Sequence, residues 1–152
     1  MNNAKIAFTK QGYEKLEKEL AALVVKREPT VLRLQAAREQ GDLSENGAYK
    51  AARFELSDID HNIRRVTHLL KDGVVQEARH DGRIGFGNRV TLDKDGTKIE
   101  YLIVGKHESD PMQKKLSVES PLGQALLGKG AGESVTITAP AGEITYKIVK
   151  ID

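Results

Sequence analysis

The chain has no cysteine, so it cannot form a disulfide scaffold, use a thiol nucleophile or bind a metal through thiolates. A long hydrophobic run is missing too. The segment Met1–Leu20 alternates charged and apolar residues and contains no stretch long enough for a signal peptide or a membrane span. We therefore expect a protein of the reducing cytoplasm that has no membrane partner.

An excess of one charge is also missing, because 24 basic residues stand against 22 acidic ones. The formal net charge of +2 gives no general attraction for nucleic acid, so contact with RNA or DNA would require a local basic patch. Hydrophobic residues make up 39% of the 152 residues, which is enough for one ordinary core or two small ones.

Helical periodicity dominates the first half of the chain. From Tyr13, apolar residues advance in steps of three and four and are interrupted once, at Arg27; they are Leu16, Leu20, Leu23, Val31, Leu34 and Ala37. Thr9 is suited to cap this helix. Pro29 removes a backbone donor inside it, so we expect a kink or a break near Glu28.

A second apolar set keeps the same spacing more strictly, as heptads do; it comprises Tyr49, Ala52, Leu56, Ile59, Ile63, Val66 and Leu70. Between the two sets lies the polar segment Gln40–Ser44, in which Gly41 is suited to end a helix. Two helices joined by so short a turn form an antiparallel hairpin. We predict a coiled-coil finger over residues 1–73, with its tip at about residues 41–46.

After Gly73 the pattern changes to short β-branched runs separated by Asp-Gly, Pro and Ala-Gly turn signals. The runs are residues 74–75, 89–92, 99–104, 116–118, 135–138 and 144–149. Leucines at helical spacing in Pro121–Gly128 predict one short helix, with Ser120 as its N-cap. The sequence thus predicts an α+β protein in which the finger is followed by a small antiparallel-sheet domain over residues 74–152.

Two acidic residues lie at the predicted tip. Asp42 and Glu45 are three residues apart, so both carboxylates can face the same way and offer oxygen ligands to a hard cation. The same spacing is that of a capping box, in which Asp42 accepts from backbone amides and Glu45 reaches back. Two carboxylates are too few to hold magnesium alone, so a metal here would have to be shared with another molecule.

Basic residues flank the acidic tip on both arms. Arg38 precedes it, and Lys50 and Arg53 follow it. Together they can steer or hold a phosphate chain, although each one alone is equally well explained as an ordinary solvated helix charge.

The segment Ala37–Asn46, with Tyr49 and Ala51–Arg53 after it, resembles the tip signature of the bacterial GreA/GreB transcription elongation factors. The chain departs from the signature at Gly47-Ala48, where members commonly have Ala-Glu. Segments of the second half resemble the C-terminal domain of the same family; they are Phe86–Val90, Tyr101–Gly105 and the stretch from Ser120 to Glu143. The resemblance therefore covers nearly the whole chain.

This resemblance implies a finger followed by a domain of FKBP-like fold, which docks on the rim of the secondary channel of bacterial RNA polymerase. The finger enters the channel and reaches the 3′ end of backtracked nascent RNA. Asp42 and Glu45 would help the polymerase's own aspartates hold a second Mg²⁺ and position a water for RNA cleavage. Arg38, Asn46 and Arg53 match further tip positions that orient the RNA or the tip. We expect a monomeric polymerase cofactor with no independent catalysis.

Three other functions fit parts of the sequence. A Gre-like protein that blocks the channel would inhibit polymerase, but the acid pair Asp42 and Glu45 argues against it. A prolyl isomerase would need an aromatic-lined pocket, for which the second half offers only Phe86, Tyr101 and Tyr146. A coiled-coil adaptor without chemistry would dimerise through its helical seam.

Overall fold

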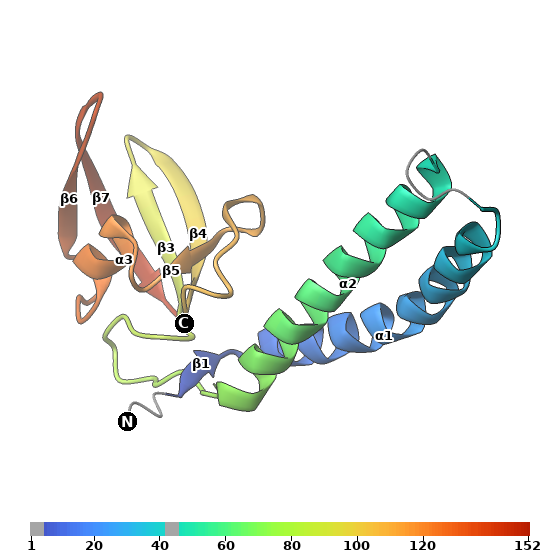
Figure 1. Cartoon of the computed structure of the whole chain (residues 1–152). Helices are drawn as coiled ribbons and strands as arrows, with labels where there is room; N and C mark the ends of the chain where they lie inside the picture. The colour runs from blue at the N-terminus through green and yellow to red at the C-terminus, as the bar shows by residue number, and fades with distance from the viewer. Residues whose placement is uncertain (1–4, 42–45) are drawn as a thin grey trace. The chain divides into compact units, whose positions relative to one another are not determined.

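The computed structural model describes residues 5–41 and 46–152, whose contacts form two compact units. The first unit contains Tyr13–Gly73, and the second contains Ile6–Gly12 and Val74–Asp152. Ile6–Gly12 therefore belongs with the C-terminal half of the chain, whereas the predicted finger included these residues. Figure 1 shows the two long helices of the first unit and the strands of the second.

The first unit is an antiparallel hairpin of two helices, α1 (Lys10–Arg38) and α2 (Gly47–Asp72). In two antiparallel helices, residues farther along α1 contact residues nearer the N-terminus of α2. Three ion pairs follow this order: Glu19 with Arg65 at 2.7 Å, Arg27 with Asp60 at 2.6 Å, and Arg33 with Glu55 at 2.9 Å. The hairpin that the two apolar sets predict is confirmed.

Each helix buries one side against the other. The buried apolar side chains are Leu16, Leu34 and Ala37 of α1 and Ala52, Ile59, Val66 and Leu69 of α2. Thr30 is fully buried in the same seam. The predicted apolar stripe did not include Thr30, because it passed from Arg27 to Val31. The Thr30 hydroxyl donates to the carbonyl oxygen of Lys26 at 3.1 Å and accepts from the Arg33 guanidinium at 3.0 Å. A polar residue is tolerated in this seam because its hydroxyl is satisfied.

Proline does not interrupt α1. The helix runs from Lys10 to Arg38 with Pro29 inside it, and Figure 1 shows it curving along its length. Of the kink or break that was predicted near Glu28, the break is wrong, because packing against α2 before and after Pro29 outweighs the roughly 3 kcal/mol that an interior proline costs. The predicted cap is confirmed, since the amide of Gly12 donates to Thr9 Oγ1 at 3.0 Å.

The second unit is built on a five-stranded sheet with the strand order β5-β4-β3-β7-β6. Its strands are β3 (Arg89–Lys94), β4 (Thr97–Val104), β5 (Lys115–Ser117), β6 (Ser134–Ala139) and β7 (Gly142–Ile151). All neighbours are antiparallel except β4 and β5, which are parallel. The sheet is thus mixed and not wholly antiparallel as predicted. The connection through the 3₁₀ helix η1 (Pro111–Gln113) carries the chain back beside Leu102, so that β5 then runs in the same direction as the end of β4.

A separate two-stranded sheet joins β1 (Ile6–Phe8) to β2 (Gly73–Val75). The next residue after β1, Thr9, contacts the loop that follows β4. Its amide donates to Glu108 Oε1 at 2.9 Å, and its hydroxyl donates to the other oxygen of the same carboxylate. These contacts explain why Ile6–Gly12 belongs to the second unit. Three residues are too few to show a period, so β1 could not be predicted from the sequence.

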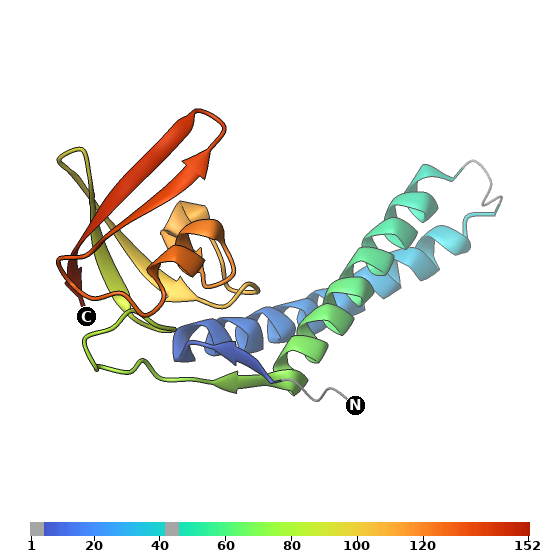
Figure 2. The same ribbon diagram turned by 90° about the vertical axis from the view of Figure 1, so that its left-hand side faces the viewer.

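The core of the second unit lies between the sheet and α3 (Pro121–Leu126), which packs beside it in Figure 2. Its buried residues are Ile84, Val90, Leu92, Ile103, Leu122, Leu126, Val135, Tyr146 and Ile148. The amide of Gly123 donates to Ser120 Oγ at 3.0 Å, so Ser120 caps α3 as predicted. The chain is therefore an α+β protein with a helical hairpin followed by a curled mixed-sheet domain.

Candidate functional site

The predicted site lies where α1 ends and α2 begins. Asp42 and Glu45 fall outside the residues that the structure describes, so their roles stay predictions. The described residues on either side are Gly41 and Asn46. Gly41 has a φ of +102°, a left-handed conformation that glycine adopts without strain. The first helix therefore ends where the sequence predicts.

Asn46 joins the two helices at this end. Its Oδ1 accepts from the backbone amide of Tyr49 at 3.0 Å, which makes Asn46 the N-cap of α2. Its Nδ2 donates to the carbonyl oxygen of Ala37, in the last turn of α1, at 2.9 Å. Asn46 therefore occupies the N-cap position of α2, and the two residues of the capping-box interpretation, Asp42 and Glu45, lie outside the described residues.

Arg38, the last residue of α1, lies over the ring of Tyr49. The guanidinium carbon is 5.8 Å from the ring centroid, which is within the range of a cation–π contact. Tyr49 is half-buried on the apolar side of α2, so its ring contacts the seam as well as the guanidinium. Arg38 itself is exposed, and its charge is therefore available to a ligand at the tip.

Two further cations lie in the first two turns of α2. Lys50 and Arg53 are exposed, as Arg38 is. The neighbouring Arg33 on α1 is instead neutralised by its ion pair with Glu55. Three exposed cations next to the tip can attract the phosphates of a nucleic-acid chain.

Two acidic residues of α2 behind the tip, Glu55 and Asp60, form ion pairs with α1. Hydrogen bonding to Arg33 lowers the pKa of Glu55, and hydrogen bonding to Arg27 lowers the pKa of Asp60. Within residues 5–41 and 46–152, no group of three or more acidic or histidine side chains is placed to hold a metal ion. The carboxylates of Asp42 and Glu45 have the oxygen chemistry that Mg²⁺ prefers, but two are fewer than its octahedral shell requires.

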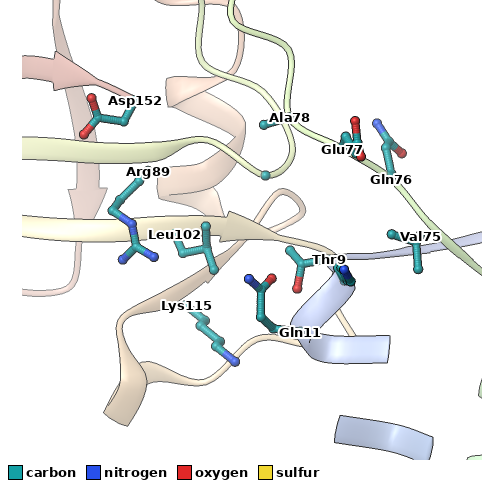
Figure 3. Close-up of a pocket in the computed structure, with 12 residues that line it drawn as sticks. Thr9, Gln11, Val75, Gln76, Glu77, Ala78, Arg89, Leu102, Lys115 and Asp152 are labelled. Atoms are coloured by element: carbon teal, nitrogen blue, oxygen red, sulfur yellow. The ribbon is translucent and has the colours of Figure 1, made fainter. Parts of the chain in front are cut away.

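The second unit contains a pocket of about 550 Å³, lined by residues at the start of α1, after β2 and in β3 and β4 (Figure 3). Its charged lining residues are Lys10, Glu77, Arg89, Lys115 and Asp152. Arg89 pairs with Glu100 and Asp152 pairs with Lys150, each at 3.4 Å. Because the lining mixes both signs and two of its charges are already paired, it shows no selectivity for an ion of one sign.

Two of the three aromatic residues of the second half belong to its interior. Tyr146 is part of the core and is only 8% exposed. Burial, with a smaller contribution from Tyr146, raises the pKa of Tyr101. A prolyl isomerase would need such rings to line an open pocket, so this hypothesis gains no support from the structure.

Both halves of the chain are similar to known transcription factors. Residues 6–75 match the family described as "Transcription elongation factor, N-terminal", and residues 79–152 match the family described as "Transcription elongation factor, GreA/GreB, C-term". The chain is 37% identical to transcription elongation factor GreA of Geobacillus kaustophilus, over 99% of this chain and 98% of that protein. It is 40% identical to GreA of Staphylococcus epidermidis, over the same shares of the two proteins.

A solved structure is similar along the same length. GreA factor homolog 1 (Gfh1) of Thermus thermophilus aligns with 97% of this chain and 99% of its own, at 27% sequence identity and a TM-score of 0.46.

Proposed function

Because the chain belongs to the GreA/GreB family of transcription elongation factors, we propose that it binds RNA polymerase and stimulates the polymerase's own cleavage of backtracked RNA. In this proposal the protein is an accessory factor and not an independent enzyme. Its finger enters the secondary channel, and its second unit docks on the rim of that channel. The protein works as a monomer in the cytoplasm.

The observation that carries the proposal is the clamp that Asn46 forms between the two helices. Asp42 and Glu45 lie in the short segment between the end of α1 and this residue. A clamp at the junction limits the freedom of the helix ends, which favours presenting a side chain to a partner's active site in a defined position. The ion pairs along the hairpin stiffen the arm behind it.

In this proposal the carboxylates of Asp42 and Glu45 would hold Mg²⁺ together with aspartates of the polymerase. When bound, the metal supplies Lewis-acid stabilisation of the attacking and leaving oxygens of the phosphodiester. Arg38, Lys50 and Arg53 hold the phosphates near the 3′ end of the RNA. Two carboxylates alone bind the metal too weakly for the free protein to cleave RNA.

The proposal is tested with 3′-labelled RNA in a backtracked bacterial elongation complex, at constant magnesium concentration. Wild-type protein is expected to shorten the RNA, while Asp42→Asn and Glu45→Gln bind the polymerase normally and give no stimulated cleavage. Glu39→Gln is the matched control, because it removes an exposed carboxylate near the tip without touching the pair. It is expected to behave like the wild type.

Two results would contradict the proposal. Cleavage by Asp42→Asn at the wild-type rate would show that the acid pair has no role. Binding of the wild-type protein without any cleavage would instead assign it to factors that block the channel and inhibit the polymerase.

A further inference from the structure

We infer that the chain associates weakly with a second copy of itself through the outer edge of β6, so that two five-stranded sheets join into one. β6 is the last strand at one end of the sheet and pairs only with β7. In the described part of the chain nothing pairs with its outer side. Such an edge is a template for another strand unless the sequence protects it.

Within Ser134–Ala139, β6 lacks three of the usual protections, which are a charge, a proline and a bulge. Its sequence, Ser-Val-Thr-Ile-Thr-Ala, has no charged residue and no proline, and its register with β7 is continuous from Ser134 to Ala139. The strand at the opposite edge, β5, is only three residues long and begins with Lys115. Short length and an edge lysine both oppose strand addition, so the two edges of the sheet differ in this respect.

Backbone hydrogen bonds reveal which residues of β6 face outward. The amide of Ile148 donates to the carbonyl oxygen of Glu133 at 2.8 Å, so Glu133 faces β7. Alternation along an antiparallel pair makes Val135, Ile137 and Ala139 face β7 as well. The N–H and C=O groups that point away from the sheet therefore belong to Ser134, Thr136 and Thr138.

The outward-facing residues of β6 are complementary to the same residues of a second copy that runs antiparallel to it. In an antiparallel pair centred on Thr136, this residue faces Thr136 of the second copy, and Ser134 faces Thr138 of the second copy. All of these are hydrogen-bonded pairs, because both partners direct their amide and carbonyl groups outward. Val135 faces Ile137 of the second copy. Hydroxyl residues thus meet hydroxyl residues, and β-branched apolar residues meet their like.

The match continues into β7. Thr136 Oγ1 lies 2.9 Å from Thr145 Oγ1, so the central row of the joined sheet would be a run of threonines. Lys147 lies beside Ser134, and Glu143 lies beside Thr138. Each neighbouring row on the same face would therefore run from a lysine of one copy to a glutamate of the other. These two charges lie three strand spacings apart, about 14 Å, so the register centred on Thr136 follows from the outward hydrogen-bonding groups and not from the charges.

The pairing is weak because the contact is small. A six-residue edge buries well under the ~800 Å² per partner of a standard interface, and we expect a dissociation constant of ~0.1 mM or weaker. The monomer expected from the sequence is then the dilute form. The inference does not depend on the proposed function, since none of the residues that carry it lies in the finger.

The association is tested by sedimentation velocity over a concentration series of the full chain, together with amide hydrogen exchange at each concentration. We expect a shift from monomer to dimer as concentration rises. The amides of Ser134, Thr136 and Thr138 should then exchange more slowly, while those of Val135 and Ile137 should not change, because they are already bonded to β7.

Thr136→Pro removes the outward amide at the centre of the pair without removing a bond to β7, and it should weaken association at least ~tenfold. Thr136→Val is the matched control, because it keeps the amide and the β-branched shape; it should still associate. Thr136→Lys opposes two ammonium groups and should lower association most at low salt. Circular dichroism checks that each variant is folded.

Three results would overturn the inference. The first is a wild-type chain that stays monomeric at every concentration reached. The second is a dimer that Thr136→Pro leaves intact, which would place the contact elsewhere. The third is equal protection of the outward amides and of the amides that face β7. Protection by a foreign extended peptide, without any self-association, would count in the same way.

Discussion

The side-chain amide of Asn46 donates to the carbonyl oxygen of Ala37 at 2.9 Å, so the residue that precedes α2 is bonded to the last turn of α1. The carbonyl oxygen of the same side chain caps α2 through the amide of Tyr49. One asparagine thus bridges two helices with different atoms. Substitutions can therefore separate its two roles.

Asn46→Ala should lower the free energy of unfolding of the hairpin by about 1–2 kcal/mol, because it removes the cap and the bridge together. Asn46→Asp should cost less, because it keeps an acceptor for Tyr49 and loses only the donor to Ala37. The measurement is chemical unfolding followed by helical circular dichroism. Asn62→Ala, which removes a bond to Asp58 within α2, is the control, with a change within about 0.5 kcal/mol. Equal losses for the alanine and aspartate variants would show that the cap plays no part.

Arg38→Ala should weaken the contact with backtracked RNA, and the loss should shrink as salt concentration rises, because screening removes the same charge effect from the wild type. The measurement is the concentration of factor that gives half-maximal cleavage, at low and at high salt. Arg53→Ala should behave in the same way. The control is Arg65→Ala, which removes an arginine whose partner is Glu19 in α1. A loss that is identical at all salt concentrations would contradict an electrostatic role.

Gly12→Ala should destabilise the second unit, although alanine normally favours a helix over glycine by up to about 1 kcal/mol. A Cβ at this position would clash with the carboxyl group of Glu108, which is held by Thr9. In the background Glu108→Ala the clash disappears, so the same substitution should stabilise. Thermal unfolding of the four variants of this cycle measures the coupling. A stabilising effect of Gly12→Ala in both backgrounds would show that the carboxyl group moves aside freely.

Acid should loosen the hairpin. Glu55 and Asp60 have pKa values below their ordinary 4.5 and 3.8, chiefly through hydrogen bonds to Arg33 and Arg27. A carboxyl group whose pKa is lowered on folding contributes stability above its unfolded pKa, and this contribution is lost as pH falls through the folded value. The midpoint of urea unfolding should therefore stay level near neutral pH and fall below about pH 4.5.

In the variant Asp60→Asn, the midpoint of urea unfolding should fall less at acid pH, because one of the two titrating carboxyl groups has been removed. Asp58→Asn is the matched control on the same helix, since Asp58 has no ion pair among the described residues. If the unfolding midpoint of Asp60→Asn falls with pH as the wild-type midpoint does, the pair with Arg27 contributes nothing to stability.

Local signals in the sequence were sufficient to predict the hairpin. The strict spacing from Tyr49 to Leu70 predicts a single apolar side on α2, and its members Ala52, Ile59 and Val66 are buried. At the end of the helix Leu69 is buried where Leu70 was predicted. Thr9 and Ser120 were identified as caps because capping depends on a residue type and its distance from the helix start. Gly41 was likewise predicted to lie in the turn after α1, which ends at Arg38, because a residue without Cβ adopts a φ of +102° without strain.

The wrong or missing predictions involve competition between distant segments. Pro29 was expected to kink or break α1, and the packing against α2 explains why the helix continues through it. Thr30 continues the seven-residue spacing of Leu16 and Leu23, so the sequence contains a signal for its burial in the seam. It was not predicted there because its side chain is polar. Asn46 was not predicted as the N-cap of α2, and its second bond, to the carbonyl oxygen of Ala37, depends on how close the end of α1 lies.

By itself the sequence determined the local conformations, since periodicity, caps and glycines act within one or two turns of chain. It also determined the family, because the tip signature and the C-terminal segments are long and specific. The tertiary structure decided what depends on contacts between distant residues: the parallel pairing of β5 with β4, the transfer of Ile6–Gly12 to the second unit, and the open edge of β6. Such contacts are decided by the free energy of the whole assembled unit, which no local stretch of sequence contains.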